Sequence, residues 1–156
     1  MPLPLRQLAS SCLFPLLLST ATSALAASSL FGHWTTADGS TIVSLPCGGQ
    51  GNQALCLRIE RVSPSAPGTV DEKNPNASLR QRPLCGVEIG SGFHLEGETR
   101  AIGGTVYDPL SGNTYKGSME VSGDMLKLRG YLGISLFGRT EVWHRTSAPV
   151  GGCRPS

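Results

Sequence analysis

The residues best placed by type and spacing to form a binding site are Tyr107, Asp108 and Tyr115, which flank an Asp-Pro-Leu-Ser-Gly turn. Two phenol rings across a hairpin, next to a carboxylate, would orient a ligand at the rim of a cavity. Turn chemistry also explains them, because a leading Asp accepts backbone hydrogen bonds and cross-strand tyrosines pack together. The sequence favours the turn interpretation and leaves the binding interpretation open.

Motifs of enzymatic chemistry are absent from the sequence. It contains no nucleophile elbow, zincin, P-loop or dinucleotide motif. A hydrolase that uses Asp108 or Glu141 is the remaining enzymatic alternative, but no matching nucleophile and base accompany these carboxylates. We therefore predict no catalytic residues and no cofactor.

The first 26 residues are organised like a secretory signal peptide. Arg6 supplies a positive start, residues 13–25 are apolar, and Ala24-Leu25-Ala26 is a site of small residues after which we place cleavage. The apolar stretch is too short and too often interrupted for a transmembrane anchor. We predict a signal peptide over 1–26, a single domain over 27–156, and a periplasmic or secreted location.

The composition excludes several classes of protein. The net charge of +2, from 13 basic and 11 acidic residues, is too balanced for a nucleic-acid binder or a polybasic membrane binder. With 39% hydrophobic and only 15% charged residues, the chain does not resemble a disordered protein. The 20 glycines show no three-residue period, which excludes collagen, and they suit turns and bends.

The cysteines predict disulfide bonds. Five cysteines become four once the signal peptide is removed, and four allow three pairings. Cys47 and Cys56 flank a Gly-rich segment between two predicted strands and can face each other across a hairpin, which leaves Cys85 to pair with Cys153. A zinc site of four thiolates is the alternative, but the paired C-x-x-C spacing is absent.

Most of the mature chain alternates apolar and polar residues with the period of a β-strand, and no amphipathic helix of ordinary length is present. We predict an all-β fold, an up-and-down antiparallel barrel of about eight strands, because closure buries the apolar face and removes the sheet edges. A two-sheet sandwich is the alternative. The strand-like runs are 31–36, 40–45, 54–62, 84–89, 93–98, 100–108, 114–121, 125–132 and 139–145.

Two residues at the ends of the sheet favour closure. Trp34, in a Gly-x-Trp motif, opens the first strand, and Arg145 ends the last. This pair resembles the lipocalin–calycin arrangement, which implies that the Trp plugs one end of the barrel and the Arg stacks on it. His33 and His144 would then point outward on neighbouring strands. They lack a third ligand, so we interpret them as solvated histidines and predict no metal site.

Two further features concern the interior and its cover. Arg139 and Glu141 share the strand face of Trp143, so an inward face would place an ion pair in the barrel, as a structural latch or a polar anchor for a ligand.

Residues 63–82 form one long irregular segment, which is either a lid or a disordered excursion. Within it we expect a short helical turn near 77–80. Its Arg80 and Arg82 would bind an anion, pair with Asp71 and Glu72, or remain solvated.

Two segments carry a closer resemblance. They are Y-D-P-L-S-G-N-T-Y over 107–115 and N-P-N-A-S-L-R-Q-R-P-L over 74–84. Together with the motifs above, they make most of the mature chain similar to the bacterial exported family called domain of unknown function 2147. The resemblance implies an exported, lipocalin-like barrel with no established activity. Asn76 and Ala101 depart from the family, whose members often carry Asp and an aromatic residue there.

These features lead to one functional prediction. We expect a barrel that binds a small, mostly apolar molecule with Trp34, Tyr107, Asp108, Tyr115 and Trp143. An envelope-associated structural or protein-interaction module that uses its outer surface is the alternative. An eight-stranded barrel can be filled by its own side chains or hold one small ligand, so the sequence does not decide between them. It does not define the oligomeric state either.

Overall fold

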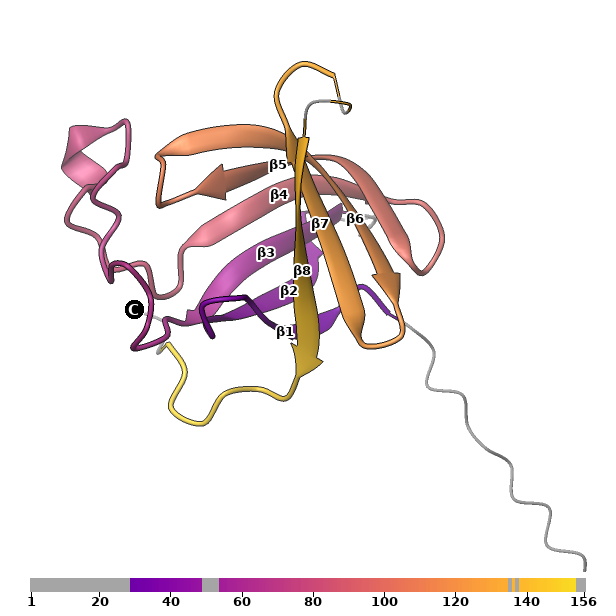
Figure 1. Ribbon diagram of the computed structural model, residues 1–156, viewed down its shortest axis with the longest axis horizontal. Helices are drawn as coiled ribbons and strands as arrows, with labels where there is room; N and C mark the ends of the chain where they lie inside the picture. The colour runs from indigo at the N-terminus through magenta and orange to yellow at the C-terminus, as the bar shows by residue number, and fades with distance from the viewer. Residues whose placement is uncertain (1–28, 49–53, 135, 137, 154–156) are drawn as a thin grey trace, which may run out of the picture.

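The computed structural model (Figure 1) describes residues 29–48, 54–134, 136 and 138–153. Eight antiparallel strands follow one another around a closed barrel, and β1 pairs with β8 to complete it. The predicted up-and-down barrel is therefore confirmed, and closure excludes the sandwich. The strands are β1 Gly32–Thr35, β2 Thr41–Cys47, β3 Ala54–Arg61, β4 Glu88–Leu95, β5 Arg100–Asp108, β6 Asn113–Ser122, β7 Met125–Tyr131 and β8 Gly138–Thr146.

Apolar and polar residues alternate along the strands, and the apolar ones form the core of the barrel. On β7, Leu126 and Leu128 are buried inside the barrel, whereas Lys127 is exposed. On β8, Trp143 is buried and pairs in register with Leu126. The described residues include one short 3-10 helix, η1, over Ala77–Leu79, in the expected place. No helix in this described part is long and apolar enough to cross a membrane.

One pair of predicted strands forms a single strand. The runs 84–89 and 93–98 contribute to the continuous strand β4, Glu88–Leu95. Gly92 within it has a φ of +70°, and the pairing of β3 with β4 shifts between Leu55 and Leu57. A glycine at positive φ absorbs an extra residue as a bulge, so a segment that resembles a turn in sequence remains inside a strand.

One end of the barrel is closed by Trp34. Its ring is fully buried, and the Arg145 guanidinium lies 4.2 Å from the ring centroid. Arg145 also donates to the carbonyl oxygens of Phe31 (3.2 Å) and Ser29 (2.5 Å), while the indole N–H of Trp34 donates to Ser44 Oγ at 2.9 Å. The predicted cation–π contact is present and seals this end.

The half of the barrel next to Trp34 is filled by side chains. Phe93, on β4, is fully buried and lies directly against the backbone of two glycines, one on β5 and one on β6. A Cβ at Gly104 would lie 2.4 Å from the Phe93 ring, and one at Gly117 would lie 3.0 Å from it. The ring therefore occupies space that any other residue at these positions would need.

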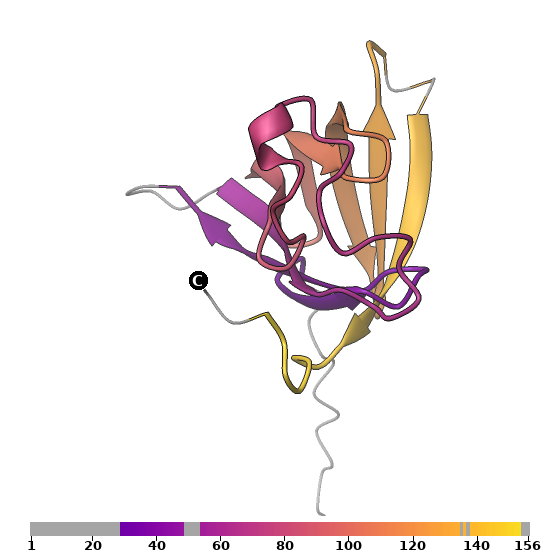
Figure 2. The same ribbon diagram turned by 90° about the vertical axis from the view of Figure 1, so that its left-hand side faces the viewer.

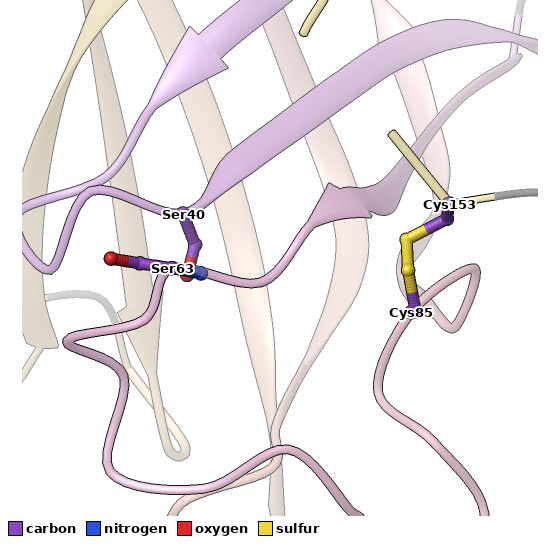
Figure 3. The surroundings of a disulfide bond; sticks show 4 residues. All are labelled: Ser40, Ser63, Cys85 and Cys153. Atoms are coloured by element: carbon purple, nitrogen blue, oxygen red, sulfur yellow. A yellow bond between two sulfur atoms is a disulfide. The ribbon is translucent and has the colours of Figure 1, made fainter. Parts of the chain in front are cut away.

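Two disulfides fasten the barrel. Cys47–Cys56 joins β2 to β3, and Cys85–Cys153 joins the carboxy-terminal segment to the chain just before β4 (Figure 3). Both predicted pairings are present, which excludes the four-thiolate zinc site. Figure 3 also shows Ser40 beside Ser63, whose backbone N–H donates to Ser40 Oγ at 3.0 Å where the long loop begins. The predicted signal peptide, residues 1–26, lies outside the described residues.

Candidate functional site

The end of the barrel opposite Trp34 contains a cavity of about 720 Å³. It is bordered by the connections between β1 and β2, β3 and β4, β5 and β6, and β7 and β8, which all lie at this open end. Its buried wall is apolar and includes Ile42, Ile59, Leu128 and Trp143. The barrel is therefore half filled and half hollow.

Four of the five predicted ligand-contacting residues line this cavity: Tyr107, Asp108, Tyr115 and Trp143. The fifth, Trp34, lies at the sealed end and is not part of the lining. Arg145 stacks on the indole and Ser44 accepts its N–H, and both contacts keep Trp34 at the sealed end. We therefore leave Trp34 out of the candidate site.

Asp108 is occupied by its own turn. Oδ1 accepts from the backbone N–H of Leu110 at 2.9 Å, and Oδ2 accepts from Ser111 Oγ at 2.7 Å. This is the turn chemistry expected of an Asp in the first position. Asp108 thus shapes the rim of the cavity through the turn.

Tyr107 connects the barrel to the long loop. Its hydroxyl donates to Oδ1 of Asp71, which is fully buried. Oδ2 of Asp71 accepts from Asn74 Nδ2 at 2.7 Å and from Arg82 Nε at 2.8 Å. The sequence alone indicates Asp71 only as a partner for Arg80 or Arg82. Its partner Tyr107 lies 36 residues away in the chain, and no local pattern signals that contact.

These hydrogen bonds shift the pKa values of Asp71 and Tyr107. Burial raises the pKa of Asp71, but hydrogen bonds from Tyr107, Asn74 and Arg82, with the positive charge of Arg82, outweigh it, and the net pKa is lowered. Burial and the Asp71 carboxylate raise the pKa of Tyr107 to about 12. At neutral pH the carboxylate is ionised and the phenol keeps its proton, so the network is complete.

The long loop forms part of the cavity wall. Besides the bonds to Asp71, the N–H of Leu84 donates to the carbonyl oxygen of Thr69 at 2.9 Å, which joins the segment after the loop to the loop itself. Residues 66–68 line the cavity, and Figure 2 shows the loop and η1 passing in front of the strands. The loop therefore contacts the barrel rather than extending away from it.

The two arginines of the loop bind partners within it. Arg80 Nε donates to the carbonyl oxygen of Asn74 at 2.9 Å, and Arg82 forms an ion pair with Asp71 at 2.7 Å. Of the alternatives left open by the sequence, Arg82 is thus a partner of Asp71. Neither guanidinium is positioned as a separate anion site.

Strand alternation predicts that Arg139 and Glu141 share the inner face of β8 with Trp143, and this prediction is confirmed. Arg139 and Glu141 both line the cavity with Trp143. Glu141 Oε2 accepts from the indole N–H of Trp143 at 3.1 Å, but the described residues contain no ion pair between Arg139 and Glu141. The expected latch is not formed, and both side chains remain exposed at the mouth.

The histidines of the first and last strands have different surroundings. His144 is exposed on β8, as expected of a solvated histidine, but that interpretation is wrong for His33, which is half-buried and lies with Nδ1 2.5 Å from Glu60 Oε2. The described residues hold no group of three or more His, Cys, Asp or Glu side chains suited to a metal ion.

Exposed apolar side chains lie on two of the connections that border the cavity. Leu110, Leu132, Ile134 and Leu136 are between 58% and 76% exposed. Leu110 belongs to the β5–β6 turn, and the others belong to the β7–β8 connection, which projects beyond the strands in Figure 1. Leu110 and Leu132 also line the cavity, so the rim continues its apolar wall.

Comparison with known proteins identifies similarities of sequence and fold. A family described as "Uncharacterized protein conserved in bacteria (DUF2147)" matches residues 32–145. No curated protein matches the chain. A solved structure titled "Protein HP1028 from the human pathogen Helicobacter pylori belongs to the lipocalin family" aligns with a TM-score of 0.66 and 23% identity, over 77% of this chain and 84% of that one. At this identity the likeness concerns the fold alone.

Proposed function

The chain belongs to the bacterial family DUF2147, and from that premise we propose that it is an exported, non-enzymatic protein that binds or carries a small, mostly apolar molecule. The supporting observation is the cavity of about 720 Å³ beside a sealed half of the barrel. Ligand pockets typically measure about 300–1,000 Å³ and are mainly apolar with a few polar groups. A barrel of eight strands whose interior is not filled by its own side chains can hold one small ligand, as in lipocalins.

The export part of the proposal is supported by cysteine chemistry. Two disulfides join strands and segments that lie apart in the chain. Such bonds persist in oxidising compartments such as the bacterial periplasm and are rare in the cytosol. The signal peptide over 1–26 remains a prediction from its sequence.

Native mass spectrometry of the protein purified from the periplasm tests the proposal. We expect a co-purifying molecule that is released on denaturation, and binding of the neutral fluorophore 1-aminoanthracene by the stripped protein. In Gly130→Leu a side chain would extend from the cavity wall and weaken binding. Lys127→Leu adds the same side chain on the outer face of β7 and should leave binding unchanged.

A bare mass together with no fluorophore binding would contradict a binding function. Equal binding by Gly130→Leu and Lys127→Leu would place any bound molecule outside the cavity. Both variants are compared after thermal unfolding has shown that they are folded.

The apolar rim supports a second candidate, an envelope interaction module. Exposed apolar surface that continues into a groove is typical of contact sites. Replacing Ile134 and Leu136, which are exposed and outside the cavity lining, by Ser would then abolish cross-linking to an envelope protein in cells while leaving fluorophore binding intact. Unchanged cross-linking in that double variant would reject this candidate.

A further inference from the structure

The charged groups that line the cavity differ in how their hydrogen-bonding capacity is used. Asp38 accepts from Ser40 N–H and Ser40 Oγ, both at 3.1 Å, and from the Thr36 hydroxyl. Asp108 is occupied by its turn. Glu141 accepts from the buried Trp143 indole, which needs an acceptor. Each lining carboxylate therefore already has a role in the fold.

Arg139 and Tyr115, like Tyr131, carry donors at the cavity that the described part of the fold does not use. Among the described residues, no hydrogen bond or ion pair involves the Arg139 guanidinium or the Tyr115 hydroxyl. A guanidinium presents five N–H donors and no acceptor, and a phenol presents one O–H donor. Both side chains line the cavity, so these donors are available to a bound molecule.

The two donors flank a bare part of the wall. Gly130 on β7 pairs in register with Arg139 on β8. On its other side is β6, and a Cβ at Gly130 would lie 3.5 Å from Tyr115 Cβ. Gly130 itself lines the cavity. Because glycine has no side chain, residue 130 adds no atoms to the cavity between the strand positions of Arg139 and Tyr115.

We propose that Arg139 and Tyr115 bind the anionic head group of an amphiphilic ligand, a carboxylate such as that of a fatty acid. This inference rests on the proposed function, since it names the class of molecule that the cavity would hold. The planar guanidinium can donate two parallel hydrogen bonds to a carboxylate, and Tyr115 donates a third. The apolar chain then lies against Ile42, Leu128 and Trp143.

The carboxylates of Asp38, Asp108 and Glu141 act against an anion and favour a cation at the same mouth. The test therefore compares three head groups on one chain: decanoate, 1-decanol and decyltrimethylammonium. Their affinities are measured by displacement of 1-aminoanthracene from the mature protein. We expect decanoate to bind about tenfold more tightly than 1-decanol, the low end for a charge-assisted hydrogen bond at an exposed site.

Variants assign the preference to the two residues. Arg139→Gln should reduce the decanoate-to-decanol ratio to about one, Arg139→Lys should retain part of it, and Tyr115→Phe should reduce it about threefold. Arg100→Gln is the matched control, because Arg100 is an ion-paired surface arginine at the opposite end of the barrel. It should keep the wild-type ratio. Thermal unfolding of each variant verifies the fold.

The outcomes separate the two proposals. Binding of none of the three amphiphiles and no fluorophore binding would reject the cavity as a binding site, and the head-group inference with it. Equal binding of all three, or tighter binding of decyltrimethylammonium, would retain the cavity and overturn the anionic head group. An unchanged ratio in Arg139→Gln would overturn the assignment to Arg139.

Discussion

At the scale of single residues, Asp71 determines how the open end of the barrel is built. Its buried carboxylate accepts hydrogen bonds from Tyr107 on β5 and from Asn74 and Arg82 in the loop. A buried charge is stable only when it is paired and hydrogen-bonded, and all of these donors are present. The neighbouring Glu72 is exposed.

Replacing Asp71 by Asn removes the charge that Arg82 and Tyr107 face. Breaking a buried ion pair costs about 3–5 kcal/mol when the remaining partner stays buried. Arg82 is partly exposed, so we expect a loss of about 2–3 kcal/mol in the free energy of unfolding, measured with urea. The control Glu72→Gln should change it by less than about 0.5 kcal/mol. Equal effects of both variants would show that the network does not stabilise the fold.

The lowered pKa of Asp71 also predicts a dependence on pH. A carboxyl whose folded pKa lies below its unfolded value, about 3.9, contributes full stability above that value and loses it as pH falls through the folded pKa. The stability difference between wild type and Asp71→Asn should therefore be constant from about pH 5 to 7 and shrink below about pH 4. Urea unfolding at each pH measures it, and a difference that grows on acidification would contradict this assignment.

At the scale of strands, close packing between a ring and glycine backbones defines the filled half of the barrel. Phe93 on β4 reaches across β5 to β6, where only Gly104 and Gly117 leave room for its ring. Along the same inner row, Gly130 on β7 has no such neighbour and borders the cavity. The boundary between filled and hollow halves therefore lies where Phe93 ends.

The glycine row predicts unequal effects of alanine. In Gly104→Ala a Cβ would lie 2.4 Å from the Phe93 ring and force it to move, at a cost of about 1–3 kcal/mol in the free energy of unfolding. In Gly130→Ala the nearest side-chain atom is 3.5 Å from the new Cβ, an ordinary contact, so stability should change little. Urea unfolding of both variants measures these changes. Similar losses of unfolding free energy in the two variants would show that the close packing around Phe93 does not stabilise the fold.

The strands were largely predictable because their signal is local. Alternation over a few residues, as in Leu126-Lys127-Leu128, is enough to assign β7 and its inner face. Gly92 misled the prediction of β4, since glycine marks a turn and a bulge equally well. Contacts such as Tyr107 with Asp71, or a cavity beside Phe93, depend on residues brought together by closure and leave no pattern in any one segment.

At the scale of the whole molecule, the two disulfides constrain very different lengths of chain. Cys47 and Cys56 are 9 residues apart, whereas Cys85 and Cys153 are 68 apart and join the carboxy-terminal segment to the region before β4. The backbone N–H of Cys153 also donates to the carbonyl oxygen of Glu60 at 2.6 Å. The long bridge thus attaches the tail beside β3.

Removing each bridge separately should reveal this difference. In the chain-entropy description, closing the short loop contributes about 2.7 kcal/mol and closing the long one about 4 kcal/mol. The double variant Cys85→Ala with Cys153→Ala should therefore lose more unfolding free energy in urea than Cys47→Ala with Cys56→Ala. Equal losses, or a larger loss from the short bridge, would contradict this ranking.

The plug formed by Trp34 and Arg145 makes the hollow half of the barrel a blind pocket. A molecule bound there can enter and leave only through the open end of the barrel. A conduit, in which cargo enters at one face and leaves at the other, is incompatible with this shape. Under the proposed carrier function, a bound molecule would enter from its donor and leave to its recipient through the same open end, so the whole protein would reorient between loading and release.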